Sequence, residues 1–203
     1  LTALWASLGC DRAVVEEKID LHAEISLIIV RAQDGTTTTY DPAENQHRKH
    51  VLDVSIVPAR MPEALLTQAR ETAVTIARAL EYVGVLAVEL FVVDSELLIN
   101  ELAPRPHNSG HWTLDACVTS QFEQQVRAVC GLGLGSTTMT APSIAMVNLL
   151  GDLWEHGSPD WSVVLDEPAA KLHLYGKGQA RPGRKMGHLT VTSDVSTAAA
   201  ARA

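Results

Sequence analysis

Short apolar runs separated by polar turns dominate the pattern along this chain, and runs of this length predict β-strands. We expect strands over residues 13–19, 24–31, 36–40, 51–57, 85–93, 97–102, 143–150, 171–175 and 188–192. Asp34-Gly35 is a strong hairpin signal between the second and third of these runs. Residues 41–50 are polar and lack alternation, so we expect a loop there.

Two segments repeat apolar side chains every three or four positions, which is the pattern of an amphipathic helix. The first covers residues 62–83, and Gly84 is the expected stop after it. The second runs from about residue 113 to 131. Ser120-x-x-Glu123 forms a possible capping box within it, if the helix restarts there.

The order of the elements is a run of strands, a helix, two strands, a helix and then a small β region. This order indicates an α+β fold rather than a doubly wound sheet. Residues 131–142 (GLGLGSTTMTAP) form the one linker-like stretch, and we place a boundary there, with domains over 1–135 and 136–203. Because the first residue is Leu rather than Met, we expect the chain to be a piece of a longer protein.

Composition narrows the class of protein. The formal net charge of −8 argues against general binding to nucleic acid or to anionic membranes. The sequence contains no 18-residue apolar run and no secretory leader, so we expect neither a membrane span nor export. The three widely spaced cysteines form no CxxC, which suggests buried, reduced thiols in a cytoplasmic protein.

Glu89 and Glu101 each interrupt an apolar strand, where a carboxylate is unfavourable unless its charge is compensated. If the turn at 94–96 takes three residues, the two carboxylates face each other across an antiparallel pair and repel. A magnesium ion between them would remove both problems. The alternative is a pair of solvated carboxylates on the exposed face of the hairpin. Apolar neighbours such as Phe91 and Ile99 instead indicate that this face is covered.

The loop at 103–112 follows the second of these strands and is rich in hydrogen-bond donors. Its polar side chains include Arg105, His107, Asn108 and His111. Arg105 suits bidentate binding of a carboxylate, bicarbonate or phosphate, and His107 can donate to the same anion or shuttle a proton. His107 and His111 also have the spacing of two zinc ligands on a helix, although the proline and glycine in the loop disfavour a helix.

A second basic segment lies at 176–187 (GKGQARPGRKMG). It carries four cations within nine residues, namely Lys177, Arg181, Arg184 and Lys185. With four glycines in the segment, this composition is compatible with a phosphate-binding loop or with a solvated basic loop.

The run 100–112 (NELAPRPHNSGHW) resembles, nearly residue for residue, the N5-carboxyaminoimidazole ribonucleotide synthase family of ATP-grasp enzymes. Residues 13–24, 145–154 and 171–188 resemble further stretches of the same family in the same order. The resemblance implies the C-terminal part of an ATP-grasp domain, an antiparallel sheet with helices, followed by a small β-rich C-terminal domain. Ala103 departs from the asparagine that many ATP-grasp enzymes place there.

The resemblance also implies a role for each matching position. ATP-binding residues would be Glu16, Glu17, Lys18, Ile19, Glu24, His47, Asn100 and Glu101. Magnesium ligands would be Glu89 and Glu101, and the catalytic pair that holds bicarbonate would be Arg105 and His107. Substrate-binding residues would be Arg105, His107, Asn108, Lys177, Arg181, Arg184 and Lys185.

The implied reaction is ATP-dependent carboxylation of 5-aminoimidazole ribonucleotide by bicarbonate in purine biosynthesis, with Mg²⁺ as cofactor and a homodimer as the assembly. The family's glycine-rich phosphate-covering loop and Rossmann-like domain have no counterpart in these residues. Two alternatives remain open at this point. One is a formate-dependent glycinamide ribonucleotide transformylase, and the other is a non-catalytic half-domain that needs an N-terminal partner.

Overall fold

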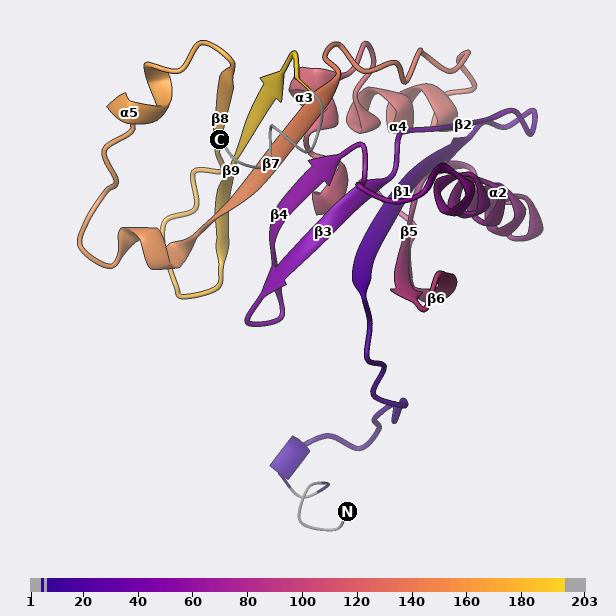
Figure 1. Ribbon diagram of the computed structural model, residues 1–203, viewed down its shortest axis with the longest axis horizontal. Coiled ribbons are helices and arrows are strands. Elements are labelled where there is room, and N and C mark those ends of the chain that lie inside the picture. The colour runs from indigo at the N-terminus through magenta and orange to yellow at the C-terminus, as the bar shows by residue number, and fades with distance from the viewer. Residues whose placement is uncertain (1–4, 6, 196–203) are drawn as a thin grey trace.

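A single antiparallel sheet with helices on both faces forms the body of the protein (Figure 1). The computed structural model describes residue 5 and residues 7–195. Its strands are β1 (Ala23–Arg31), β2 (Thr37–Thr39), β3 (Ala43–Arg48), β4 (Val51–Val57), β5 (Gly84–Val93), β6 (Glu96–Ala103), β7 (Ser143–Leu150), β8 (Ala170–Leu174) and β9 (Lys185–Ser193). The sheet order is β6-β5-β1-β3-β4-β7-β9-β8, with β2 paired to β1.

The helices are short apart from one. They are α2 (Glu63–Ala79), α3 (Thr113–Ala116), α4 (Gln121–Val129) and α5 (Ser162–Leu165), with 3₁₀ turns η1 (Asn108–Gly110) and η2 (Gly151–Trp154). The predicted α+β class is confirmed. None of the helices in the described part of the chain combines the length and the apolar character needed to cross a bilayer.

Two predictions of local structure are wrong. Residues 13–19 form no strand and are largely exposed, in an arm that leaves the body of the molecule (Figure 1). Conversely, the expected loop at 41–50 contains β3, which pairs with both β1 and β4. β3 can occupy this central position because its polar side chains form ion pairs and hydrogen bonds with other residues. Glu44 forms an ion pair with Arg60, and Ser55 donates to Asn45.

The long helix ends earlier than its apolar pattern suggested. α2 stops at Ala79, and the residue that turns the chain is Glu81, in the left-handed region with φ +48°, rather than Gly84. The Tyr82 amide donates to the Ala77 carbonyl, which is the closing bond of a Schellman motif. The second predicted helix is split into α3 and α4, and the Ser120 hydroxyl caps the restart at the Glu123 amide.

The two faces of β1 build two cores. Ile25, Leu27 and Ile29 pack with α2 on one face. Ile28 and Val30 face the opposite side, in a cluster with residues of α3 and α4. The helices thus cover the second face over only part of its length, and its uncovered end carries polar residues.

The two predicted domains share this sheet, because β7 pairs with β4. The boundary at 135/136 therefore stays a prediction. The expectation of buried cysteines holds only for Cys117, since Cys10 and Cys130 are exposed.

Candidate functional site

The candidate site occupies the end of the sheet face that α3 and α4 leave uncovered. On β1, the side chains of this face change from Val30 and Ile28 to Ser26 and Glu24. On the neighbouring strand β5, the apolar series is interrupted at Glu89, whose register partner is Ser26. The same alternation that builds the core therefore directs these polar side chains into one region.

Glu89 and Glu101 face each other across β5 and β6, as predicted, but by a different route. The turn contains two residues, Asp94 and Ser95, with φ of +46° and +70°. A two-residue turn alone would pair Glu89 with Asn100. A bulge leaves Asn100 unpaired and restores the register of the two carboxylates.

The Glu101 carboxylate affects the ionisation of Glu89. Burial, then the charges of Glu101 and Glu24, raise the pKa of Glu89 above its ordinary value. The expectation of a covered face is wrong for β6, because Glu101 is exposed and Ile99 on this edge strand is 55% exposed. Two adjacent carboxylates at a half-open edge fit the oxygen donors and the accessibility that Mg²⁺ requires.

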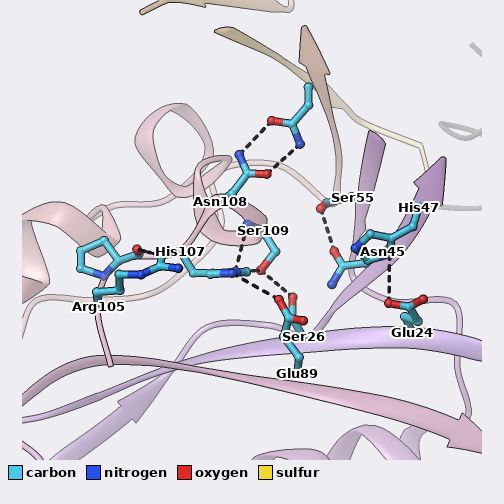
Figure 2. A network of polar contacts seen from close by, with 12 residues as sticks. Glu24, Ser26, Asn45, His47, Ser55, Glu89, Arg105, His107, Asn108 and Ser109 are labelled. Atoms are coloured by element: carbon cyan, nitrogen blue, oxygen red, sulfur yellow. Dashed lines mark hydrogen bonds and ion pairs between the residues drawn. The ribbon is translucent and has the colours of Figure 1, made fainter. Parts of the chain in front are cut away.

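His107 links the loop to Glu89 (Figure 2). Its Nε2 lies 3.2 Å from Glu89 Oε1, and its Nδ1 lies 2.9 Å from Ser109 Oγ. The Ser26 hydroxyl donates to Ser109 Oγ at 2.8 Å. Burial, with the nearby cations Arg105 and Lys185, lowers the pKa of His107 to about 4. The neutral imidazole then donates from Nε2 to Glu89 and accepts the Ser109 hydroxyl at Nδ1.

The loop is held in place by amide side chains. Asn108 and Asn148 of β7 exchange two amide hydrogen bonds of 2.8 Å, and Asn148 also donates to the Leu52 carbonyl. Gln121, which is fully buried, accepts from the His107 amide and donates to the His107 carbonyl. The Asn108 side chain thus already has a structural role, and its predicted contact with substrate stays a prediction.

Five of the nine residues predicted to bind nucleotide or metal line one cavity. His47 Nδ1 lies 2.9 Å from Glu24 Oε2 (Figure 2). A cavity of about 510 Å³ is lined by Glu24, His47, Lys49, His50, Glu89, Phe91, Asn100 and Glu101. Residues 16–19 do not line it and lie in the irregular arm. The arm and the cavity are therefore not joined in this structure.

The four cations of the basic segment separate into two groups. Lys177, Arg181 and Arg184 lie on the loop between β8 and β9, and Arg184 donates to the Gln179 carbonyl at 2.8 Å. Lys185 begins β9 and is half-buried. Burial, then the Arg105 and Lys177 charges, lowers the pKa of Lys185, while the Glu89 carboxylate opposes that shift. Lys185 is thus electrostatically coupled to the carboxylate site.

Sequence reasoning missed the residues that position both loops. Ser26 and Ser109 give no sequence signal beyond their alternation with apolar neighbours. Gly151 and Asp152 follow β7 directly, and such a Gly-Asp step could have marked a close approach of backbone. The Gly151 amide donates to the Arg184 carbonyl at 2.8 Å, and Asp152 Oδ2 accepts from the Gly183 amide at 2.7 Å.

Replacing Gly151 by Ala should displace the basic loop that connects β8 to β9. A Cβ at this position would lie 2.1 Å from the Arg181 carbonyl oxygen, so the loop backbone must move away. We expect faster tryptic cleavage after Lys177 and Arg184, followed by mass spectrometry. Gly178→Ala is the matched control in the same loop, because its Cβ meets nothing within 4 Å. Equal cleavage rates in the two variants would contradict the anchoring role of Gly151.

Comparisons with known proteins divide the chain into two matches. Residues 2–122 match the ATP-grasp domain family, and residues 144–202 match the family of the phosphoribosylaminoimidazole carboxylase C-terminal domain. N5-carboxyaminoimidazole ribonucleotide synthase of Bacillus subtilis is 49% identical over 178 residues, covering 87% of this chain and 46% of the relative.

Solved structures give the same result. N5-carboxyaminoimidazole ribonucleotide synthetase from Thermus thermophilus superposes with a TM-score of 0.82 at 46% identity, covering 89% of this chain and 48% of that one. The Aspergillus clavatus N5-carboxyaminoimidazole synthase, in complex with ADP and 5-aminoimidazole ribonucleotide, has a TM-score of 0.79 at 32% identity, with coverage of 90% and 49%. The chain spans about half the length of these relatives.

Proposed function

The chain belongs to the ATP-grasp family. We propose that the protein containing this chain uses ATP and bicarbonate to carboxylate 5-aminoimidazole ribonucleotide in purine biosynthesis. The observation that carries this proposal is the pair Glu89 and Glu101, opposed across two strands, with His107 bonded to Glu89 and Arg105 on the same loop. The relatives named for this reaction support the choice of substrate.

Glu89 and Glu101 would hold Mg²⁺, for which their oxygen donors and mutual repulsion are suited. The ion would supply neutralisation of the charge on the β- and γ-phosphates of ATP. The nucleotide would occupy the cavity lined by Glu24, His47 and Asn100. Its adenine would meet residues 16–19, which the resemblance assigns to the adenine-binding segment.

Arg105 would hold bicarbonate in bidentate fashion, with His107 as a second donor. A bicarbonate oxygen attacks the γ-phosphorus, the bond to the β-phosphate oxygen breaks, and ADP and carboxyphosphate result. The exocyclic amine of the nucleotide then attacks the carboxyl carbon, and inorganic phosphate leaves. Since the chemistry needs little covalent help, fixed positions and charges supply most of the rate enhancement.

The 5′-phosphate of the nucleotide substrate would bind the basic loop. The cations available to it are Lys177, Arg181, Arg184 and Lys185. A homodimer and a cytoplasmic location, both expected from the sequence, stay predictions.

The test is substrate-dependent phosphate release by the polypeptide as its gene encodes it, measured beside the 203-residue chain. We expect release with ATP, bicarbonate and 5-aminoimidazole ribonucleotide together, and the carboxylated nucleotide by mass spectrometry. Release with formate and glycinamide ribonucleotide instead would favour the transformylase. Nucleotide binding without turnover of either set of substrates would favour a non-catalytic module.

Replacing Ser109 by Ala should lower kcat by about 3- to 10-fold, because one hydrogen bond that orients a side chain contributes roughly 0.5–1.5 kcal/mol. The variant removes the bond to His107 Nδ1 and leaves the Ser26 hydroxyl without its acceptor. KM for ATP should not change, since Ser109 does not line the nucleotide cavity. Ser162→Ala, which alters an exposed serine, is the control. A change confined to KM would argue against a role in positioning His107.

A further inference from the structure

A cluster of histidines lies between α3 and the β8–β9 hairpin, and the proposed reaction does not use it. His173 and His188 are register partners on adjacent strands, and their rings stack at 4.5 Å with an interplanar angle of 12°. Asp115 of α3 contacts His173, with Oδ2 2.8 Å from His173 Nε2. His111 approaches from the loop, its ring 5.2 Å from that of His188.

His188 has one nitrogen without a partner. The side chain is only 1% exposed, and its Nδ1 lies 2.8 Å from the Tyr175 hydroxyl. Within the described part of the chain, its Nε2 has no hydrogen-bond partner. A buried polar atom without a hydrogen bond is unfavourable, so its presence here indicates that something else satisfies it.

We propose that Asp115, His173 and His188 form a binding site for a borderline divalent transition-metal ion such as Zn²⁺. One donor atom from each residue lies within 4.8 Å of the other two. In a tetrahedral site with bonds of about 2.1 Å, donors lie roughly 3.4 Å apart, so small side-chain rotations close the set around an ion. The fourth position remains open to water.

The donor chemistry separates this site from the Glu89–Glu101 pair. Two imidazoles and one carboxylate favour zinc and its neighbours, whereas a pair of carboxylates favours magnesium. Tyr175 supplies the second interaction that metal-bound histidines usually make, because its hydroxyl contacts Nδ1 and leaves Nε2 for the ion.

The site would join parts of the chain that are distant in sequence. Asp115 lies in the helical layer, while His173 and His188 flank the basic loop on β8 and β9. A metal bound there would fix the base of this loop to α3. The role of the metal is therefore structural, and metal binding does not depend on the proposed carboxylation.

The test is Zn²⁺ binding to the chelator-treated chain, by isothermal titration calorimetry and by metal analysis after dialysis. We expect one equivalent per chain in the wild type. Asp115→Asn and His188→Gln should each weaken binding by at least about 100-fold, more than loss of an outer-shell partner typically does. His156→Gln, at an exposed histidine, and Glu89→Gln, at the carboxylate pair, should retain the full equivalent.

Two results would overturn the proposal. One is the absence of stoichiometric binding to the wild type. The other is binding that survives both Asp115→Asn and His188→Gln, which places the ion elsewhere. If a variant fails to fold by circular dichroism, X-ray absorption at the zinc edge of the wild type decides. Two imidazoles in the coordination shell support the site, and a shell of oxygen atoms alone refutes it.

Discussion

Glu101→Gln should lower kcat for ATP-dependent carboxylation by about 10³-fold, equivalent to roughly 4 kcal/mol of transition-state stabilisation. The amide keeps the shape of the side chain but removes one of the two facing negative charges that would hold Mg²⁺. The measurement is steady-state phosphate release at saturating ATP. Glu96→Gln is the matched control, because Glu96 lies on the same strand, is exposed and does not line the cavity.

The same variant has a second readout that does not depend on activity. Since the Glu101 charge helps to raise the pKa of Glu89, its removal should bring the pKa of Glu89 down toward its ordinary value. Carbon-13 NMR of the glutamate carboxyls measures this shift. Wild-type kcat together with an unchanged pKa of Glu89 would contradict the proposed pairing and its metal.

The protein should lose stability steeply as pH falls from 7 to 5. Burial lowers the pKa of His107, of His111 and of His188 to about 4 in each case. The unfolded chain takes up these protons near pH 6.5, whereas the folded state resists them until about pH 4. The contribution of these histidines to the stability of the folded state is therefore complete above pH 6.5. It is lost as the pH falls toward 4.

Each of these histidines contributes about 2 kcal/mol to the expected loss between pH 7 and pH 5. The three losses are not strictly additive, since the pKa of His111 is also lowered by His107, and that of His188 by His111. The raised pKa of Glu89 acts in the opposite direction, because its neutral form relieves repulsion at lower pH.

Urea unfolding at pH 7, 6 and 5 measures this dependence. His111→Gln should flatten the slope, whereas His156→Gln, at an exposed histidine, should leave it unchanged. A free energy of unfolding that stays constant from pH 7 to 5 would show that the buried histidines titrate normally. The carboxylates interfere little in this range, since most of them titrate below pH 5.

Much of the sheet could be predicted because its signals are local. The apolar run of β1, the turn at Asp34-Gly35 and the Ser120 cap each depend on residues that are adjacent in sequence, and the structure contains all three. β3 could not be predicted this way. Its Glu44 and Asn45 become acceptable in a central strand only through Arg60 and Ser55, which come later in the chain.

The residue types of the candidate site can be read from the sequence alone: two carboxylates on neighbouring strands, then a loop with Arg105 and His107. How these side chains meet depends on the fold. The bulge at Asn100 aligns Glu89 with Glu101, and Ser26, 83 positions before Ser109, completes the bonds that orient His107. Hydrogen bonds between distant residues form only once the sheet has brought their backbones together, and no local pattern encodes that proximity.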